Sequence, residues 1–173
     1  MARRNTGFFC MQAKKEGQIN MQPLKVFAYR FGAELTLDIT NVIEKSQRYY
    51  LLNPSLENFA PRNFYYAGLY LGKVRDSVFF PSFNFLNILL NSAKNLVIVN
   101  KKAAWLFVCG RDVFQEGIEE IKGSKQKGSF SLVLNQYGEC LGFGVVVDFG
   151  GRSHNKVVVR NLLDIGDFLR RER

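Results

Sequence analysis

Gly142 and Gly144 lie in the most apolar strand pattern of the sequence, at residues 140–147. Side chains of a strand point alternately to opposite faces, so the two glycines leave one face bare. Another backbone can come close to that bare face. Residues 129–134 also alternate, with one face mostly polar, and the turn at residues 135–138 joins the two segments. The pattern predicts an antiparallel hairpin, packed closely against a neighbouring strand.

An apolar run at residues 104–109 precedes this hairpin and ends at Gly110. It contains Trp105 and Cys109, and its apolar residues would fall on both faces of a strand. We therefore expect a central, buried strand here. A short helical piece is expected after it, at residues 113–116.

The segment after the hairpin is basic and predicts one more strand, at residues 157–159. Alternation would place Lys156, Val158 and Arg160 on one face of this strand. Val157 and Val159 would then face inward. Two cations would therefore point in the same direction.

The N-terminal half combines helices with short strands. A helix is expected from Pro23, with Leu24, Phe27 and Phe31 on one face and Gly32 at its end. A second helix is expected at residues 83–90. Strands are expected at residues 35–39, 48–52, 64–71 and 73–80.

A polar joint at residues 91–95 is the best candidate for a domain boundary. We expect a basic flexible tail at residues 1–17, an N-terminal α/β domain at residues 18–92, and a second domain at residues 95–173. The fold class is therefore α+β, with a small antiparallel sheet in the first domain.

The charge balance favours a polyanionic partner. The chain has 24 Lys and Arg against 15 Asp and Glu, a net charge of +9, and its pI is about 9.6. Nucleic acid is the usual partner of such a surplus of positive charge. The same charge is equally consistent with a basic soluble protein that has no such partner. One basic group is Lys125 and Lys127 in a Gly/Ser-rich loop. The second group comprises Arg152, His154, Lys156 and Arg160.

No catalytic, metal or cofactor site is expected. His154 is the only histidine and has no nucleophile near it in sequence, and the carboxylates show no paired spacing. The three cysteines are widely spaced, which argues against zinc. Cys109 and Cys140 fall in predicted apolar strands, where reduced thiols are buried. No apolar run approaches the ~20 residues of a membrane span.

Several motifs of this sequence resemble a known family, the Nip-seven ribosome-biogenesis factors of archaea and eukaryotes. They are Leu71-Gly72-Lys73, Val108-Cys109-Gly110-Arg111-Asp112, Gly117-Ile118, Leu141-Gly142-Phe143-Gly144-Val145 and Asp164-Ile165-Gly166-Asp167-Phe168-Leu169-Arg170. The resemblance implies an N-terminal α/β domain followed by a C-terminal PUA domain, which is a small β pseudo-barrel. The basic tail favours the archaeal type.

The resemblance implies a non-catalytic, RNA-binding adaptor in ribosome biogenesis and pre-rRNA processing. Its partners would be single-stranded, uridine-rich RNA, other assembly factors and the exosome. The family's RNA-contacting residues correspond here to Arg152, Lys156 and Arg160. Such a protein would be cytoplasmic in an archaeon and nucleolar in a eukaryote. An accessory subunit of an RNA-modifying enzyme is the alternative, and a protein-interaction module is a third hypothesis.

Overall fold

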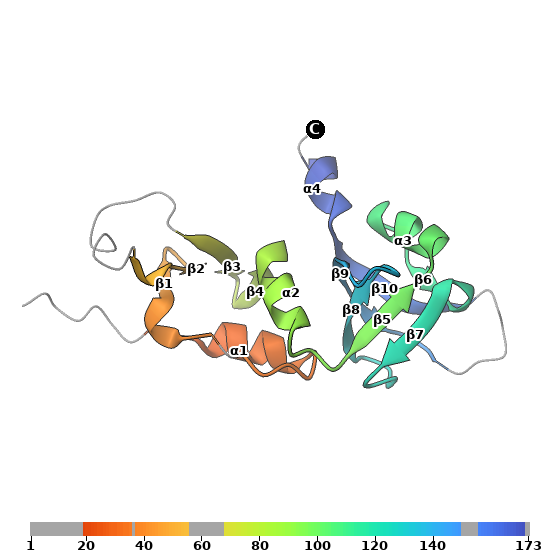
Figure 1. Ribbon diagram of the computed structural model, residues 1–173, viewed down its shortest axis with the longest axis horizontal. Coiled ribbons are helices and arrows are strands. Elements are labelled where there is room, and N and C mark those ends of the chain that lie inside the picture. Colours follow the sequence, from red (N-terminus) through yellow and green to blue (C-terminus); the bar gives the residue numbers. More distant parts are fainter. Residues whose placement is uncertain (1–18, 36, 56–67, 150–155, 172–173) are drawn as a thin grey trace, which may run out of the picture.

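The computed structural model describes residues 19–35, 37–55, 68–149 and 156–171. Its two sheets lie in the two halves of the chain, with helices between and around them (Figure 1). The α+β class predicted from the sequence is confirmed, with a small antiparallel sheet first and a curled half-barrel sheet second. The tail expected at residues 1–17 lies outside the described residues.

The N-terminal sheet is antiparallel and follows chain order. Its strands are β1 (Val42–Lys45), β2 (Arg48–Leu51), β3 (Leu69–Arg75) and β4 (Val78–Pro81). Helices α1 (Gln22–Tyr29) and α2 (Phe83–Leu90) were both predicted from the sequence. Ser82 begins α2, because its hydroxyl accepts the N–H of Phe85 at 3.2 Å.

The C-terminal sheet has six strands, in the spatial order β6-β10-β9-β8-β5-β7. Their bounds are β5 (Leu96–Val99), β6 (Val113–Phe114), β7 (Ile118–Lys122), β8 (Phe130–Leu134), β9 (Cys140–Val146) and β10 (Val157–Asp164). Strands β5 and β8 are parallel, whereas the other pairs are antiparallel. The 3-10 turn η3 (Gln115–Gly117) joins the two edge strands directly, so the sheet curls round. Helix α4 (Gly166–Arg171) follows β10.

The expected central strand at residues 104–109 is wrong, because this segment belongs to helix α3 (Lys101–Val108). The side chain of Asn100 caps the helix by accepting the N–H of Ala103 at 2.9 Å. Only Ala103 and Phe107, four residues apart, are buried, and Trp105 is 70% exposed. An apolar run with one buried stripe was mistaken for a strand buried on both faces.

Two smaller expectations also fail. The described residues 35, 37 and 38 are in no strand, and the 3-10 turn η1 (Ile39–Asn41) leads into β1. The face of β8 that was expected to be mostly polar is buried, because Ser131 and Val133 are both 0% exposed. Val133 packs inside the curled sheet, and Leu132 packs on its outer side against the helices of the N-terminal half.

One apolar cluster joins the two halves of the chain. Phe143 of β9 packs edge-to-face against Phe27 of α1 and against Phe31 in the turn after it, with ring centroids 5.5 and 5.6 Å apart. It also stacks on Phe130 at 6.1 Å. A second cluster, including Val99 and Phe107, fills the inside of the curled sheet. The domain boundary at residues 92–95 stays a prediction, and the first cluster packs across it.

The two described cysteines lie in different surroundings. Cys140 is buried in β9 as expected, but Cys109 is exposed at the end of α3. Burial raises the pKa of the Cys140 thiol to about 11, because the thiolate would lose its hydration. With Cys10 replaced by serine, we expect iodoacetamide at pH 8 to label Cys109 within minutes and Cys140 only on unfolding. Mass spectrometry of the labelled peptides would contradict this result if both cysteines reacted at similar rates.

Candidate nucleic-acid interface

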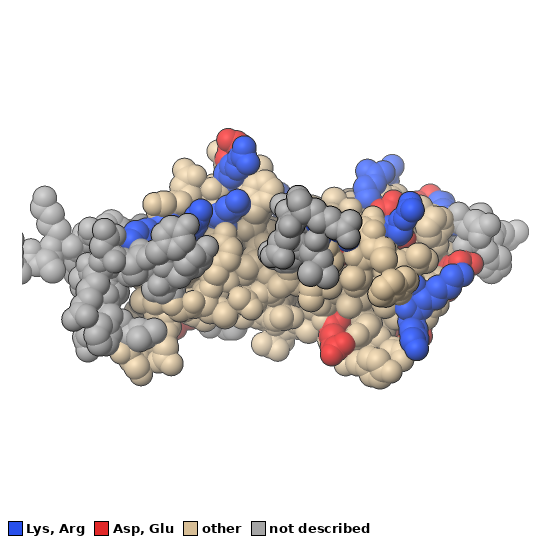
Figure 2. All heavy atoms as spheres, turned by 90° about the horizontal axis from the view of Figure 1, so that it is seen from above, with Lys and Arg blue, Asp and Glu red and all other residues tan. Residues whose placement is uncertain are grey.

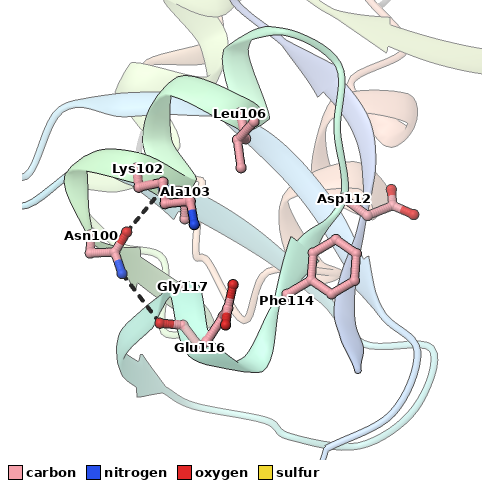
Figure 3. Close-up of a pocket in the computed structure, with 8 residues that line it drawn as sticks. All are labelled: Asn100, Lys102, Ala103, Leu106, Asp112, Phe114, Glu116 and Gly117. Atoms are coloured by element: carbon pink, nitrogen blue, oxygen red, sulfur yellow. Dashed lines mark hydrogen bonds between the residues drawn. The ribbon is translucent and has the colours of Figure 1, made fainter. Parts of the chain in front are cut away.

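A pocket of about 200 Å³ lies between helix α3 and the edge strand β6 (Figure 3). Leu106 of α3 and Glu116 of the η3 turn point into it, and Phe114 of β6 lies at its side. Asn100 ties the helix to the turn by donating to the backbone carbonyl of Glu116 at 3.2 Å. The helix can lie this close because residue 117 is glycine: a Cβ there would come within 2.5 Å of the Cβ of Ala103.

Exposed aromatic and cationic side chains lie on the elements that form this pocket and on the turn between them. Trp105 lies one helical turn after Lys101 on α3, and both are exposed. Phe114 is 40% exposed, and Arg111 is exposed in the turn that leads into β6. We call this region the α3–β6 surface, formed by Lys101, Lys102, Trp105, Leu106, Arg111 and Phe114. It offers flat rings for stacking and cations for phosphates.

Arg160 of β10 lies on the same side of the sheet as Phe114. Val157 is opposite Phe114 and Val159 is opposite Val113, so β10 carries an extra residue against β6. The strand alternation expected for this segment is therefore wrong, because Val158 and Val159 are both buried. From Val159 the next residue, Arg160, turns back to the exposed side that Phe114 shares.

The two basic groups of the sequence approach each other at the end of β9. Lys156 forms an ion pair with Asp148, and the amine of Lys125 lies 4.8 Å from the centre of the Phe149 ring. Lys127 is exposed in the same loop as Lys125. The loop is held to β9 by the N–H of Gly128, which donates to the carbonyl of Val146 at 2.8 Å.

Arg152 and His154, the other two members of the predicted site, lie outside the described residues. The structure therefore brings Lys125 and Lys156 to the same end of β9 and places Arg160 beside β6.

A polar network fixes the turn that carries Arg111. The N–H of Asn161 donates to Asp112 Oδ1 at 2.9 Å, and its Nδ2 donates to the carbonyl of Phe107 at 2.9 Å. Asp164 ends β10 and is 3% exposed; it accepts two hydrogen bonds from Arg170 Nη2 at 2.9 and 2.7 Å. These bonds raise the pKa of Arg170. Arg170 Nη1 also donates to the carbonyl of Val108 at 2.7 Å. This hydrogen bond holds α4 against the C-terminal end of α3.

Sequence reasoning missed the α3–β6 surface because it placed residues 104–109 in a strand. A detectable signal was present: Asn100 is a good N-cap, and Ala103 and Phe107 have helical spacing. A helix here would have put Lys101 and Trp105 on its outer face. The pair Lys101-Lys102 would then have been recognised as part of an interface.

Within the described ranges, no group of three His, Cys, Asp or Glu residues could hold a metal ion. Among the helices of this same part of the chain, none is long and apolar enough to cross a membrane.

Comparisons with known proteins agree with this architecture. Residues 95–173 match the family described as the UPF0113 PUA domain. A UPF0113 protein of Archaeoglobus fulgidus is 31% identical over 115 residues, which are 64% of this chain and 65% of that protein. The match therefore spans slightly less than two thirds of that relative.

Two solved archaeal structures share the fold over most of the chain. A conserved PUA domain protein of Thermoplasma acidophilum is 20% identical, with a TM-score of 0.58 over 87% of this chain and 92% of the other. A hypothetical protein of Pyrococcus horikoshii is 18% identical, with a TM-score of 0.55 over 85% and 92%. Residues 95–173 therefore match a UPF0113 PUA domain, and the chain shares the mixed α+β fold of these two structures.

Proposed function

We propose that this protein is a non-catalytic RNA-binding adaptor, which holds single-stranded RNA on the α3–β6 surface and on the neighbouring cations of β10. The observation that carries the proposal is the exposure of Trp105 and Phe114 beside cations on a PUA domain. Exposed rings next to Lys and Arg bind unpaired bases by stacking, while the cations contact phosphates.

The described cations have different parts in this proposal. Arg160 is exposed beside Phe114, so its guanidinium is available for a phosphate. Lys156 already pairs with Asp148, so RNA must compete with that carboxylate. Lys125 and Lys127 extend the proposed path at the end of β9. Arg152 and His154 belong to the same proposal on the sequence pattern alone. Uridine-rich pre-rRNA as the ligand and a role in ribosome assembly, with assembly factors or the exosome as protein partners, belong to the same proposal.

Replacing Arg152, Lys156 and Arg160 together by alanine is expected to weaken binding of single-stranded RNA whatever its sequence. Each lost phosphate contact should lower the slope of log K against log salt by about 0.7. Among the single variants, Arg160→Ala should have a larger effect than Lys156→Ala, because Lys156 is already paired. Fluorescence anisotropy at several salt concentrations measures both quantities.

Trp105→Ala tests the aromatic part of the surface, and should weaken binding by about 1–3 kcal/mol per stacked base. Tyr137→Ala is the matched control, because Tyr137 is exposed in the β8–β9 turn. Unchanged affinity and salt slope in both the triple variant and Trp105→Ala would contradict the proposal. Sequencing RNA cross-linked to the protein in cells would then test the ribosomal target separately.

A further inference from the structure

Helix α3 is held against the C-terminal sheet by contacts at its two ends. At its start, Asn100 accepts the N–H of Ala103 and donates its side-chain amide to the carbonyl of Glu116. The backbone N–H of Asn100 also donates to the carbonyl of Gly117 at 2.9 Å. Within the helix only Ala103 and Phe107 are buried, and the pocket lies between the helix and β6. The position of α3 therefore depends strongly on what holds its ends.

The C-terminal end of α3 is closed by a glycine turn. The last carbonyls of a helix have no partner within it and need other donors. Gly110 has a φ of +86°, and its N–H donates to the carbonyl of Phe107 at 2.9 Å. The N–H of Arg111 donates to the carbonyl of Leu106 at 3.0 Å. These two bonds form a Schellman motif, which fixes the point where Arg111 leaves the helix.

Two side chains from later in the chain reach the same helix end. Asn161 of β10 donates its Nδ2 to the carbonyl of Phe107 at 2.9 Å. Arg170 of α4 donates its Nη1 to the carbonyl of Val108 at 2.7 Å. The guanidinium also lies against Gly110, where a Cβ would be 3.4 Å from Arg170 Nη2. A cation in this place suits the negative end of the helix dipole.

Asp164 connects these two side chains. Its carboxylate accepts Arg170 Nη2 with both oxygens, at 2.9 and 2.7 Å, and accepts Asn161 Nδ2 at 3.2 Å. The Asp164 side chain is 4% exposed, whereas that of Arg170 is 43% exposed. A buried carboxylate is costly unless it is paired and hydrogen-bonded. Both of the partners named here also hold the end of α3.

The end of α3 carries part of the α3–β6 surface. Trp105 lies one helical turn before Cys109, whose N–H donates to the Trp105 carbonyl at 3.1 Å. Arg111 follows the glycine turn directly. The stacking ring and one cation therefore depend on the same contacts. Arg160 does not, because it lies within β10 and is held by the strand pairing with β9.

We propose that Asp164 is a positioning residue for RNA binding, which acts through Arg170 and Asn161 on the end of α3. With this end fixed, Trp105 is set to stack on a base and Arg111 is set to meet a phosphate. This role rests on the proposed function, because both contacts belong to the α3–β6 surface. Contacts that are already in place bind more tightly, since less conformational freedom is lost on association.

The sign of the expected effect separates positioning from charge. Lys and Arg side chains gather over the C-terminal half on the side of the molecule that carries α3 and α4 (Figure 2). Asp164→Asn removes a negative charge near this surface, and that change alone would favour a polyanion. Positioning predicts weaker binding instead, because an amide has only one oxygen to accept the bonds from Arg170.

The test uses the full-length chain and a uridine-rich single-stranded RNA of about 8 nucleotides. Asp164→Asn is expected to bind this RNA roughly tenfold more weakly than wild type, within the loss expected for Trp105→Ala. Arg170→Lys should show a similar loss, because lysine keeps the charge but lacks the planar fork that reaches both Asp164 and Val108. If Arg170 were itself a phosphate contact, Arg170→Lys would bind within about twofold of wild type, and the positioning role would be overturned.

Combined variants show where Asp164 acts. In the background Trp105→Ala, Arg111→Ala, the change Asp164→Asn should weaken binding by less than about twofold, because the contacts that it positions are already gone. In the Arg160→Ala background it should cause its full loss. Equal losses in both backgrounds would overturn the positioning role. Binding by Asp164→Asn that equals or exceeds that of wild type would do the same.

Ser82→Ala is the matched control for stability. It removes the bonds of a buried hydroxyl in the N-terminal half, one to the carbonyl of Tyr70 and one from the N–H of Phe85. The variant should melt earlier than wild type by circular dichroism but bind RNA equally well at temperatures below melting. An equal loss of binding in Ser82→Ala would assign the effect to stability and overturn the positioning role.

Two further outcomes keep the proposals distinct. If Asp164→Asn does not fold, Arg170→Lys decides the question, because the Arg170 side chain is partly exposed and its loss leaves the strands intact. If wild type does not bind the RNA, the proposed function falls, and the positioning role falls with it. If wild type binds and Trp105→Ala weakens binding while Arg170→Lys does not, only the positioning role is overturned.

Discussion

Replacing Phe143 with alanine is expected to lower the free energy of unfolding by about 3–5 kcal/mol. Phe143 is 7% exposed and lies at the junction of the two halves, where its ring contacts Phe27, Phe31 and Phe130. Removing the ring leaves a cavity that α1 and β8 could close only by moving closer together. Loss of ring–ring contacts adds about 0.5–1.5 kcal/mol for each pair beyond the lost burial.

Urea denaturation followed by both far-ultraviolet circular dichroism and Trp105 fluorescence measures this effect. Trp105 reports on the C-terminal half only, whereas circular dichroism reports on both. Because the cluster spans both halves, we expect the two signals to shift to lower urea together. Phe80→Ala, at a position of β4 that is 47% exposed, is the control and should change stability little. A loss below about 1 kcal/mol for Phe143→Ala would contradict the shared core.

Gly142→Ala is the second substitution expected to have a large effect, about 3 kcal/mol or more. The φ angle of Gly142 is +147°, and a Cβ there would overlap the carbonyl oxygen of Leu163 and lie 2.8 Å from the Cα of Asp164. The obstacle is backbone, so no side-chain rotation relieves it. Strand β10 would have to move away from β9, and that movement would disturb the Asp164–Arg170 contact.

Gly138→Ala measures the destabilisation that comes from backbone strain alone, without the steric overlap present at Gly142. Gly138 has a φ of +81°, but nothing lies within 4 Å of its Cβ position. Its replacement should therefore cost only about 1–2 kcal/mol, the price of a left-handed conformation with a side chain. Thermal melting of the two variants side by side gives the comparison. Equal losses would mean that β9 and β10 are not in close contact at Gly142.

The parts of the fold that could be predicted are those where local signals and burial agree. Helix α2 has a serine cap and one buried stripe, and the structure reproduces its predicted bounds. The β8–β9 hairpin was likewise identified from alternation and its turn. Gly142 was expected to allow close approach of a backbone, and Leu163 of β10 provides it.

The errors arose where tertiary packing decided the outcome. The sequence around Trp105 is apolar enough for a buried strand, but the pocket beside β6 leaves half of the helix open to solvent. In β10, the extra residue opposite β6 breaks an alternation that the sequence alone suggests is regular. Bulges of this kind depend on the partner strand, which no local pattern reveals. Of the candidate site, the cations were therefore foreseen, but the aromatic side chains beside them were not.

The packing of Phe143 against α1 also fixes an order of events during synthesis. Phe27 and Phe31 leave the ribosome more than a hundred residues before their partner on β9. Until then, the apolar side of α1 has only the N-terminal sheet and α2 to cover it. Contacts this distant in sequence form slowly, since a long loop must close first. At about 5–20 residues per second, Phe27 and Phe31 therefore lack their contact with Phe143 for several seconds of synthesis.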